Sequence, residues 1–246
     1  MDKIHYELLE PNYRTQLGLI VLQSDVTIED EIRYYFHDQP ISLFANRIPF
    51  ENEVTPETLK EMENHLGQTM SLFPSETEFD AMGYGCTSGA MHIGGQKIST
   101  LISEHRSCKH VSNPLDAAIA AFKSKGIKKI GYLGPYSEAM CQTMIDRFID
   151  AGFEVPASAS YDEAEDRFVG RIDPESIKRD AINLAKKNPD LDAVFISCTN
   201  MKCAHVIPQI EAATGIYALS SNQSLAWDLA QQTGLTLDKN KGKLFQ

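Results

Sequence analysis

The segments Asp80–Ser88 (DAMGYGCTS) and Asp192–Asn200 (DAVFISCTN) decide the fold class, because they repeat one pattern 112 residues apart. Each begins with aspartate, continues through an apolar run, and reaches Cys-Thr followed by a small polar residue. An apolar run that ends in small polar residues is typical of a strand that passes into a loop. The pattern therefore predicts that Cys86 and Cys198 follow two equivalent strands.

Three further echoes keep the same order along the chain. They pair Gly18–Ser24 with Gly131–Ser137, Val54–Leu59 with Ile172–Ile177, and Ser112-Asn113 with Ser221-Asn222. In the second pair, Thr55 and Asp173 are good helix N-caps, and each is followed by proline at the first helical position. Four echoes with offsets between 109 and 118 residues indicate two copies of one unit.

Strand-like segments alternate with helical patterns along the chain. The predicted strands are 17–22, 41–45, 81–85, 130–133, 193–197 and 216–219, and the predicted helices are 28–35, 57–72, 115–124, 138–151, 175–187 and 225–232. Such alternation predicts parallel sheets covered by helices on both faces. We expect an α/β fold with two pseudo-symmetric Rossmann-like domains, an active site in the cleft between them, and a loose polar tail after Thr236.

The two copies also give a domain division. We expect an N-terminal α/β domain over residues 1–112 and a C-terminal α/β domain over residues 113–246. This division allows the C-terminal segment to pack back against the N-terminal domain.

Composition excludes several classes of partner and site. The 246-residue chain has a formal net charge of −11 and a pI near 5.1, so nucleic acid is not an expected partner. We also expect no membrane partner, because no apolar run approaches the roughly 20 residues that span a bilayer. Five cysteines at irregular spacing and no export signal at the start predict a cytoplasmic protein with reduced thiols. A zinc site at Cys198, Cys203 and His205 is not expected, because the spacing fits no closed four-ligand pattern.

The two cysteine motifs fit carbon-acid chemistry. A hydrogen on the carbon beside a carboxylate is very weakly acidic, so a thiol that removes it needs N–H donors that favour the thiolate and donors that meet the enediolate. Cys86–Ser88 and Cys198–Asn200 each supply a thiol, a hydroxyl and a second polar side chain. With one thiol on each face of a substrate, either can take the proton while the other returns one. The result is inversion at carbon, or a cis–trans change if one thiol first adds covalently.

Each candidate residue also has a structural interpretation. Free cysteines are often buried as small apolar residues, and this is our reading of Cys108 and Cys141, which lack the motif. His92 and His205 follow the two motif cysteines, and packing on a helix flank is the simpler role for both. Other candidates follow the first strand of each copy.

Ser24 and Asp25 end the first strand and are candidate substrate-binding residues. Asp25 can cap the following helix or bind an ammonium or hydroxyl group of a substrate, and capping is the simpler role. Tyr136 can donate its phenol to a carboxylate or cover the cleft.

The paired motifs and their strand lead-ins resemble the aspartate/glutamate racemase superfamily, and within it the branch of maleate isomerases and arylmalonate decarboxylases. The resemblance covers residues 17–234. It implies two similar α/β domains with the active site between them, catalysis without a cofactor, and Cys86 and Cys198 as the catalytic thiols. The substrate contacts that it implies are Thr87, Ser88 and Tyr136 on a carboxylate, and Thr199 and Asn200 on the other side.

The departures from those families bear on the substrate. Arylmalonate decarboxylases have only the second cysteine, so Cys86 argues against that activity. Glutamate racemases have Cys-Asn-Thr and Cys-Thr-His in place of the two motifs found here. Maleate isomerases have Pro-Ser-Ser-Asn after the first strand, whereas this chain has Leu22–Asp25 (LQSD), and an acidic Asp25 suits a ligand with an amine better than a dianion. A subgroup linked to breakdown of the solute ectoine is similar in this loop.

The sequence therefore predicts a cofactor-independent isomerase or racemase that uses two cysteines on a small carboxylate or amino acid, with maleate as one candidate. Two alternatives remain, a non-catalytic module that binds a small carboxylate and an arylmalonate-type decarboxylase. A redox protein with a reversible Cys86–Cys198 disulfide is a further rival, although sulfurs that flank a substrate should lie too far apart to bond. A homodimer is the default assembly.

Overall fold

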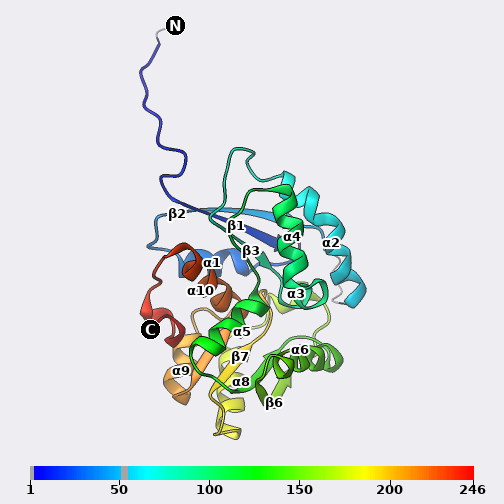
Figure 1. Cartoon of the computed structure of the whole chain (residues 1–246). Coiled ribbons are helices and arrows are strands. Elements are labelled where there is room, and N and C mark those ends of the chain that lie inside the picture. The colour runs from blue at the N-terminus through cyan, green and yellow to red at the C-terminus, as the bar shows by residue number, and fades with distance from the viewer. Residues whose placement is uncertain (1–2, 51–54) are drawn as a thin grey trace.

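The computed structural model describes residues 3–50 and 55–246 and contains two four-stranded parallel sheets (Figure 1). The first sheet has the strands β1 (Thr15–Leu22), β2 (Ile41–Ile48), β3 (Ala81–Gly85) and β4 (Val111–Ser112). The second has the strands β5 (Lys129–Gly134), β6 (Glu154–Ser160), β7 (Ala193–Ile196) and β8 (Tyr217–Ser220). The predicted α/β class with parallel sheets is confirmed.

The strand orders of the two sheets are the same, which is what a duplication requires. The first order is β2-β1-β3-β4 and the second is β6-β5-β7-β8, so each strand of the first sheet corresponds to the strand four places later. Cys86 follows β3 and Cys198 follows the end of β7 at equivalent places. Both thiols therefore lie beyond the carboxyl ends of central strands.

Helices connect the strands and cover the sheets. They are α1 (Ile28–Tyr35), α2 (Pro56–Ser71), α3 (Thr87–Ile93), α4 (Gly95–His105), α5 (Pro114–Ser124), α6 (Glu138–Asp150), α7 (Asp166–Val169), α8 (Pro174–Lys187), α9 (Ile207–Thr214) and α10 (Ser221–Thr233). Within the part of the chain that the structure describes, none of these helices has the length and apolar character to cross a membrane.

Side chains of β1 enter two different cores, because successive residues of a strand point to opposite faces. Leu17, Leu19 and Val21 pack with α1 and α10, whereas Ile20 and Leu22 pack in the core on the other face. The first sheet is therefore buried on both faces, as its apolar sequence predicts.

The helix that follows the last strand of each sheet packs against the other sheet. Phe122 of α5 makes edge contacts with Phe148 of α6 and Phe195 of β7, in the second sheet's core. In the same way Leu225 of α10 packs in a core with Leu19 of the first sheet. We propose to divide the chain at residue 112, as the sequence predicts, so that α5 belongs to the second domain, in whose core it packs, and α10 returns to the first domain.

The six predicted strands are present, and β4 and β6 are two that the sequence analysis missed. β6 contains Pro156 and small polar residues, and its register with β5 shifts between Lys129 and Gly131. An edge strand tolerates proline and a bulge, because its outer N–H groups need no partner strand. Strand β4 has only two residues, which are too few to form the alternating pattern that predicts a strand.

The predicted loose tail after Thr236 is wrong. Leu237 and Leu244 are buried, and two short 3₁₀ turns at Lys239–Lys241 and Lys243–Phe245 hold the chain against the body. The ammonium group of Lys241 donates to the Tyr34 carbonyl at 2.5 Å. The two buried leucines anchor this otherwise polar segment against the body of the protein.

Candidate active site

Cys86 is the N-cap residue of α3 and has an almost fully buried thiol. Its Sγ accepts the N–H of Gly89 at 3.2 Å and lies 3.6 Å from the Ser88 hydroxyl. Burial raises the pKa of the Cys86 thiol to about 12, although these two hydrogen bonds lower it and the negative charges of Asp166 and Asp25 add to the rise. The thiol is therefore neutral in the ligand-free protein.

Cys198 lies in an unusual backbone conformation, with φ at 124°. Its N–H donates to the Ser221 hydroxyl at 3.0 Å, and its Sγ accepts the N–H of Asn200 at 3.4 Å. Positive φ is strained for a residue with a side chain and is often found at functional sites. Burial, aided by the charge of Asp166, raises the pKa of the Cys198 thiol well above its usual value.

Tyr136 lies near both thiols. This buried residue follows β5, and the sulfurs of Cys198 and Cys86 are both near enough to affect the pKa of its hydroxyl. Burial raises the pKa of Tyr136 well above its usual value, so the phenol stays protonated and able to donate.

The two threonines of the motifs join the halves of the molecule. The Thr87 hydroxyl donates to the Ser221 hydroxyl at 2.8 Å, and the Thr199 hydroxyl donates to the Gly85 carbonyl at 3.3 Å. Each bond runs from one cysteine loop to the opposite domain. The two hydroxyl protons are thus used in holding the cysteine loops together.

A second polar cluster connects the β1–α1 loop with α7. The Asp166 carboxylate accepts the Ser24 hydroxyl at 2.6 Å and the Asn200 side-chain amide at 3.0 Å. The Asn200 carbonyl oxygen Oδ1 accepts the N–H of Val26 at 3.0 Å. Ser24 and Asn200, two predicted site residues, are therefore brought together through Asp166.

Asp25 uses its two carboxylate oxygens differently. Oδ1 accepts the N–H groups of Thr27 at 2.7 Å and Ile28 at 2.9 Å, which confirms the predicted capping role. Oδ2 is buried and has no hydrogen-bond partner. The Thr199 hydroxyl lies within reach of this carboxyl group but donates to Gly85. An unpaired buried acceptor costs about 1–3 kcal/mol.

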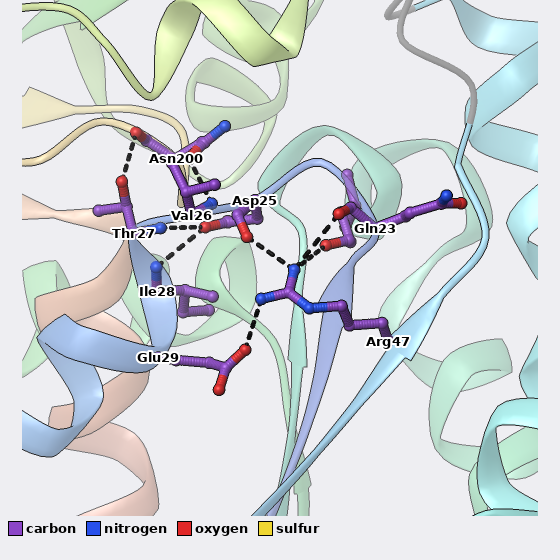
Figure 2. A network of polar contacts seen from close by, with 9 residues as sticks. Gln23, Asp25, Val26, Thr27, Ile28, Glu29, Arg47 and Asn200 are labelled. Atoms are coloured by element: carbon purple, nitrogen blue, oxygen red, sulfur yellow. Dashed lines mark hydrogen bonds and ion pairs between the residues drawn. The ribbon is translucent and has the colours of Figure 1, made fainter.

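Arg47 holds the Asp25 loop from outside without pairing with its carboxylate (Figure 2). The guanidinium donates to the carbonyl oxygens of Leu22 at 2.9 Å and Asp25 at 2.7 Å, and forms an ion pair with Glu29 at 2.6 Å. Burial raises the pKa of Asp25 to about 6, and the nearby charge of Asp166 contributes to the rise.

Glu31 of α1 holds the Cys198 loop from the opposite half of the chain. Its Oε1 accepts the N–H groups of Cys203 and Ala204, both at 2.7 Å, and its Oε2 accepts the Asn222 amide at 2.8 Å. The same Asn222 amide donates to the Thr199 carbonyl at 2.7 Å. Burial raises the pKa of Glu31 to about 7.

His92, His205 and Cys141 contact groups other than the two motif thiols. The His92 ring contacts the Met140 sulfur at 3.4 Å, and the His205 ring packs on Tyr34. The Cys141 thiol donates to the Tyr136 carbonyl at 3.4 Å. Across residues 3–50 and 55–246, no group of three or more histidine, cysteine or acidic side chains is arranged to hold a metal ion.

Sequence reasoning missed Asp166, Glu31 and Ser221 as members of this site. Asp166 lies on a four-residue helix 32 residues before Cys198, with no motif around it. Ser221 is half of the Ser-Asn echo, and that echo was the one available signal for it. Glu31 lies in the first turn of α1 among other acidic residues, and favourable interaction with the helix dipole is a sufficient reason for acidic residues there. The sequence therefore gave no separate signal for Glu31.

Comparison with known families decides the relationship. A family model described as arylmalonate decarboxylase matches residues 99–245, more than half of the chain. The chain belongs to the arylmalonate decarboxylase family. This family and the maleate isomerases form one branch of the Asp/Glu racemase-like superfamily, and the predicted branch is confirmed. Membership of the ectoine-linked subgroup stays a prediction.

Maleate isomerases are among the similar sequences. The enzyme of Geobacillus stearothermophilus is 24% identical over 244 residues, which cover 94% of this chain and 96% of that protein. The enzyme of Alcaligenes faecalis is 24% identical over 236 residues, covering 89% and 91% of the two chains.

Solved structures share the fold at low identity. The maleate isomerase of Pseudomonas putida S16 matches with a TM-score of 0.83 and 20% identity, over 94% of this chain and 98% of that one. An arylmalonate decarboxylase matches with a TM-score of 0.70 and 15% identity, over 94% and 98%. These likenesses confirm the architecture of two α/β domains.

Proposed function

We propose that the protein is a cofactor-independent isomerase or racemase that uses Cys86 and Cys198 on a small carboxylate. The observation that carries the proposal is the pair of buried thiols at equivalent strand ends, with Tyr136 near both. One sulfur, as thiolate, takes the proton from the carbon beside the carboxylate. The other thiol gives a proton to the opposite face, so the protonation states of the two sulfurs are exchanged after each turnover.

The relatives support a carboxylate substrate. One solved Nocardia farcinica maleate cis-trans isomerase mutant carries a covalently bound succinylcysteine intermediate, and its fold matches this chain with a TM-score of 0.81 at 18% identity. In this chain the corresponding covalent route would have one thiolate add to a double bond, with the second thiol giving the proton. Inversion and cis–trans isomerisation therefore need the same two groups.

The test is proton NMR in D2O with the reduced enzyme and a panel of maleate, aspartate, glutamate, diaminobutyrate derivatives and hydroxy acids. We expect deuterium to enter beside the carboxylate or cis vinyl signals to become trans. Cys86→Ser and Cys198→Ser should each lower kcat at least about 100-fold, the usual contribution of a general acid or base. Cys108→Ser, a thiol outside the site, is the matched control and should keep full activity. A Cys86→Ser enzyme with near-full kcat would refute the two-thiol mechanism.

Decarboxylation is the second candidate, favoured by the family match, which begins after Cys86 and includes Cys198. A single thiol is enough to protonate the enediolate left after loss of CO2. This reaction predicts CO2 release from an arylmalonate that depends on Cys198 and survives Cys86→Ser. A non-catalytic module predicts saturable binding with no deuterium uptake from any substrate in the panel.

A further inference from the structure

The β1–α1 loop and α7 bring two carboxylates to the buried thiols. Asp25 and Asp166 are 1% and 3% exposed, and each acts electrostatically on both Cys86 and Cys198. They also repel one another. The two charged side chains that act on both sulfurs are therefore negative.

One buried carboxylate oxygen of this pair has no hydrogen-bond partner. Asp166 is held by Ser24 and Asn200, and Oδ1 of Asp25 is held by the first turn of α1. Oδ2 of Asp25 is buried and accepts no hydrogen bond. Buried carboxylate oxygens are normally paired, and an ionised one is paired with a cation or with several N–H groups.

Arg47, the cationic side chain drawn beside Asp25 in Figure 2, is already engaged. Arg47 donates to backbone carbonyl oxygens and to Glu29, on the outer side of the loop (Figure 2). It therefore supplies no bond to Oδ2. A ligand with an ammonium group would supply the positive charge that Oδ2 lacks.

We propose that Asp25 and Asp166 form a subsite for the ammonium group of the substrate, so the substrates are small carboxylates that carry an amine. This rests on the proposed two-thiol function and narrows its substrate class. An ammonium group donates charge-assisted hydrogen bonds to Oδ2 and offsets the repulsion between the carboxylates. A dicarboxylate without an amine brings further negative charge to the same place and is disfavoured.

The subsite also explains how a thiolate can form in so buried a site. Burial and the two carboxylates raise the pKa of both thiols in the free protein. An ammonium group beside Asp25 and Asp166 offsets their charge and favours the thiolate. The substrate thus brings the charge that activates the sulfur, and an empty site keeps both thiols protonated and unreactive.

The test compares ligands that differ in the amine. Binding of aspartate and 2,4-diaminobutyrate to the wild-type enzyme is measured by calorimetry against succinate and glutarate, which lack the amine. We expect at least one amino-bearing probe to bind 10-fold or more tightly than both dicarboxylates. Asp25→Asn and Asp25→Ser keep a capping oxygen and should weaken that probe roughly 10- to 100-fold, the contribution of one charge-assisted hydrogen bond. They should leave succinate unchanged or improve it.

Glu29→Gln is the matched control, because it removes a carboxylate from the same region that faces Arg47 and not the thiols. Its binding ratio should equal that of the wild type. The subsite is refuted if the dicarboxylates bind as tightly as the amino-bearing probes, if no amino-bearing probe saturates, or if Asp25→Asn keeps the wild-type ratio. Deuterium uptake in the separate NMR assay tests the two-thiol function, so deuterium uptake from maleate with no preference for amines would reject the subsite alone.

Discussion

Individual carboxylates determine the character of this site. Asp25 and Glu31 are both buried. Glu31 accepts hydrogen bonds from three donors on its two oxygens, whereas Asp25 accepts from two donors on one oxygen. A carboxylate with all its oxygens satisfied serves structure, and here Glu31 fixes the backbone beyond Cys198. The unsatisfied Oδ2 of Asp25 is the feature that a packing role leaves unexplained.

The titration of Asp25 predicts a pH-dependent stability. Its pKa is about 6 in the folded protein and near 3.8 in an unfolded chain. The folded protein then binds more protons between these values, so the contribution is fully present below pH 3.8 and is lost as pH rises through 6. Relative to Asp25→Asn, the free energy of unfolding of the wild type should fall by up to about 3 kcal/mol between pH 4 and pH 7.

Urea denaturation of both proteins across this range measures the difference. Asp30→Asn, an exposed acid on α1, is the control and should follow the wild type at every pH. A constant difference between wild type and Asp25→Asn would show that Asp25 titrates normally.

At the scale of elements, close packing at the end of β3 places the first cysteine loop. Gly85 directly precedes Cys86, and its carbonyl accepts the Thr199 hydroxyl. A Cβ atom at Gly85 would lie 2.8 Å from the backbone oxygen of Ile20 and 2.6 Å from the Ile28 side chain. Backbone of the neighbouring strand cannot move aside as a side-chain end can.

Gly85→Ala should therefore destabilise the protein by about 1–3 kcal/mol, the usual cost of overpacking. Gly83→Ala on the same strand is the matched control. Its Cβ would meet the ends of the Leu19 and Leu225 side chains at 3.2 Å, and these can shift. Chemical denaturation should rank Gly85→Ala as the less stable variant. Equal stabilities would mean that the strands separate easily at this point.

At the scale of the whole molecule, an arm extends from the start of β1 away from the two sheets (Figure 1). Ile4, Tyr6 and Leu8 are 80–87% exposed and alternate with Lys3, His5 and Glu7. Alternation of apolar and polar residues is the pattern of a strand with one buried face. Exposed apolar side chains on one face of such an arm make it a candidate interaction site.

The expected homodimer stays a prediction, and the arm gives it a test. Deletion of residues 1–13 should convert a dimer into monomers in light scattering, with little change in unfolding, because residues 3–13 are exposed. The triple variant Ile4→Ser/Tyr6→Ser/Leu8→Ser should act like the deletion. A dimer that survives both changes would assign the interface to another surface.

The opposite face of the arm provides the control. Replacing Lys3, His5 and Glu7 by serine leaves the apolar face intact, and this variant should remain dimeric.

The sequence by itself determined the duplication, the α/β class and the placement of Cys86 and Cys198 after equivalent strands. These features follow from local periodicity, which a linear pattern records. Only the tertiary structure decided that α10 returns to the first sheet, that Asp166 joins Ser24 and Asn200, and that one oxygen of Asp25 is left unpaired. Ser24 and Asp166 are 142 residues apart, and contacts between such distant residues leave no pattern in the local sequence.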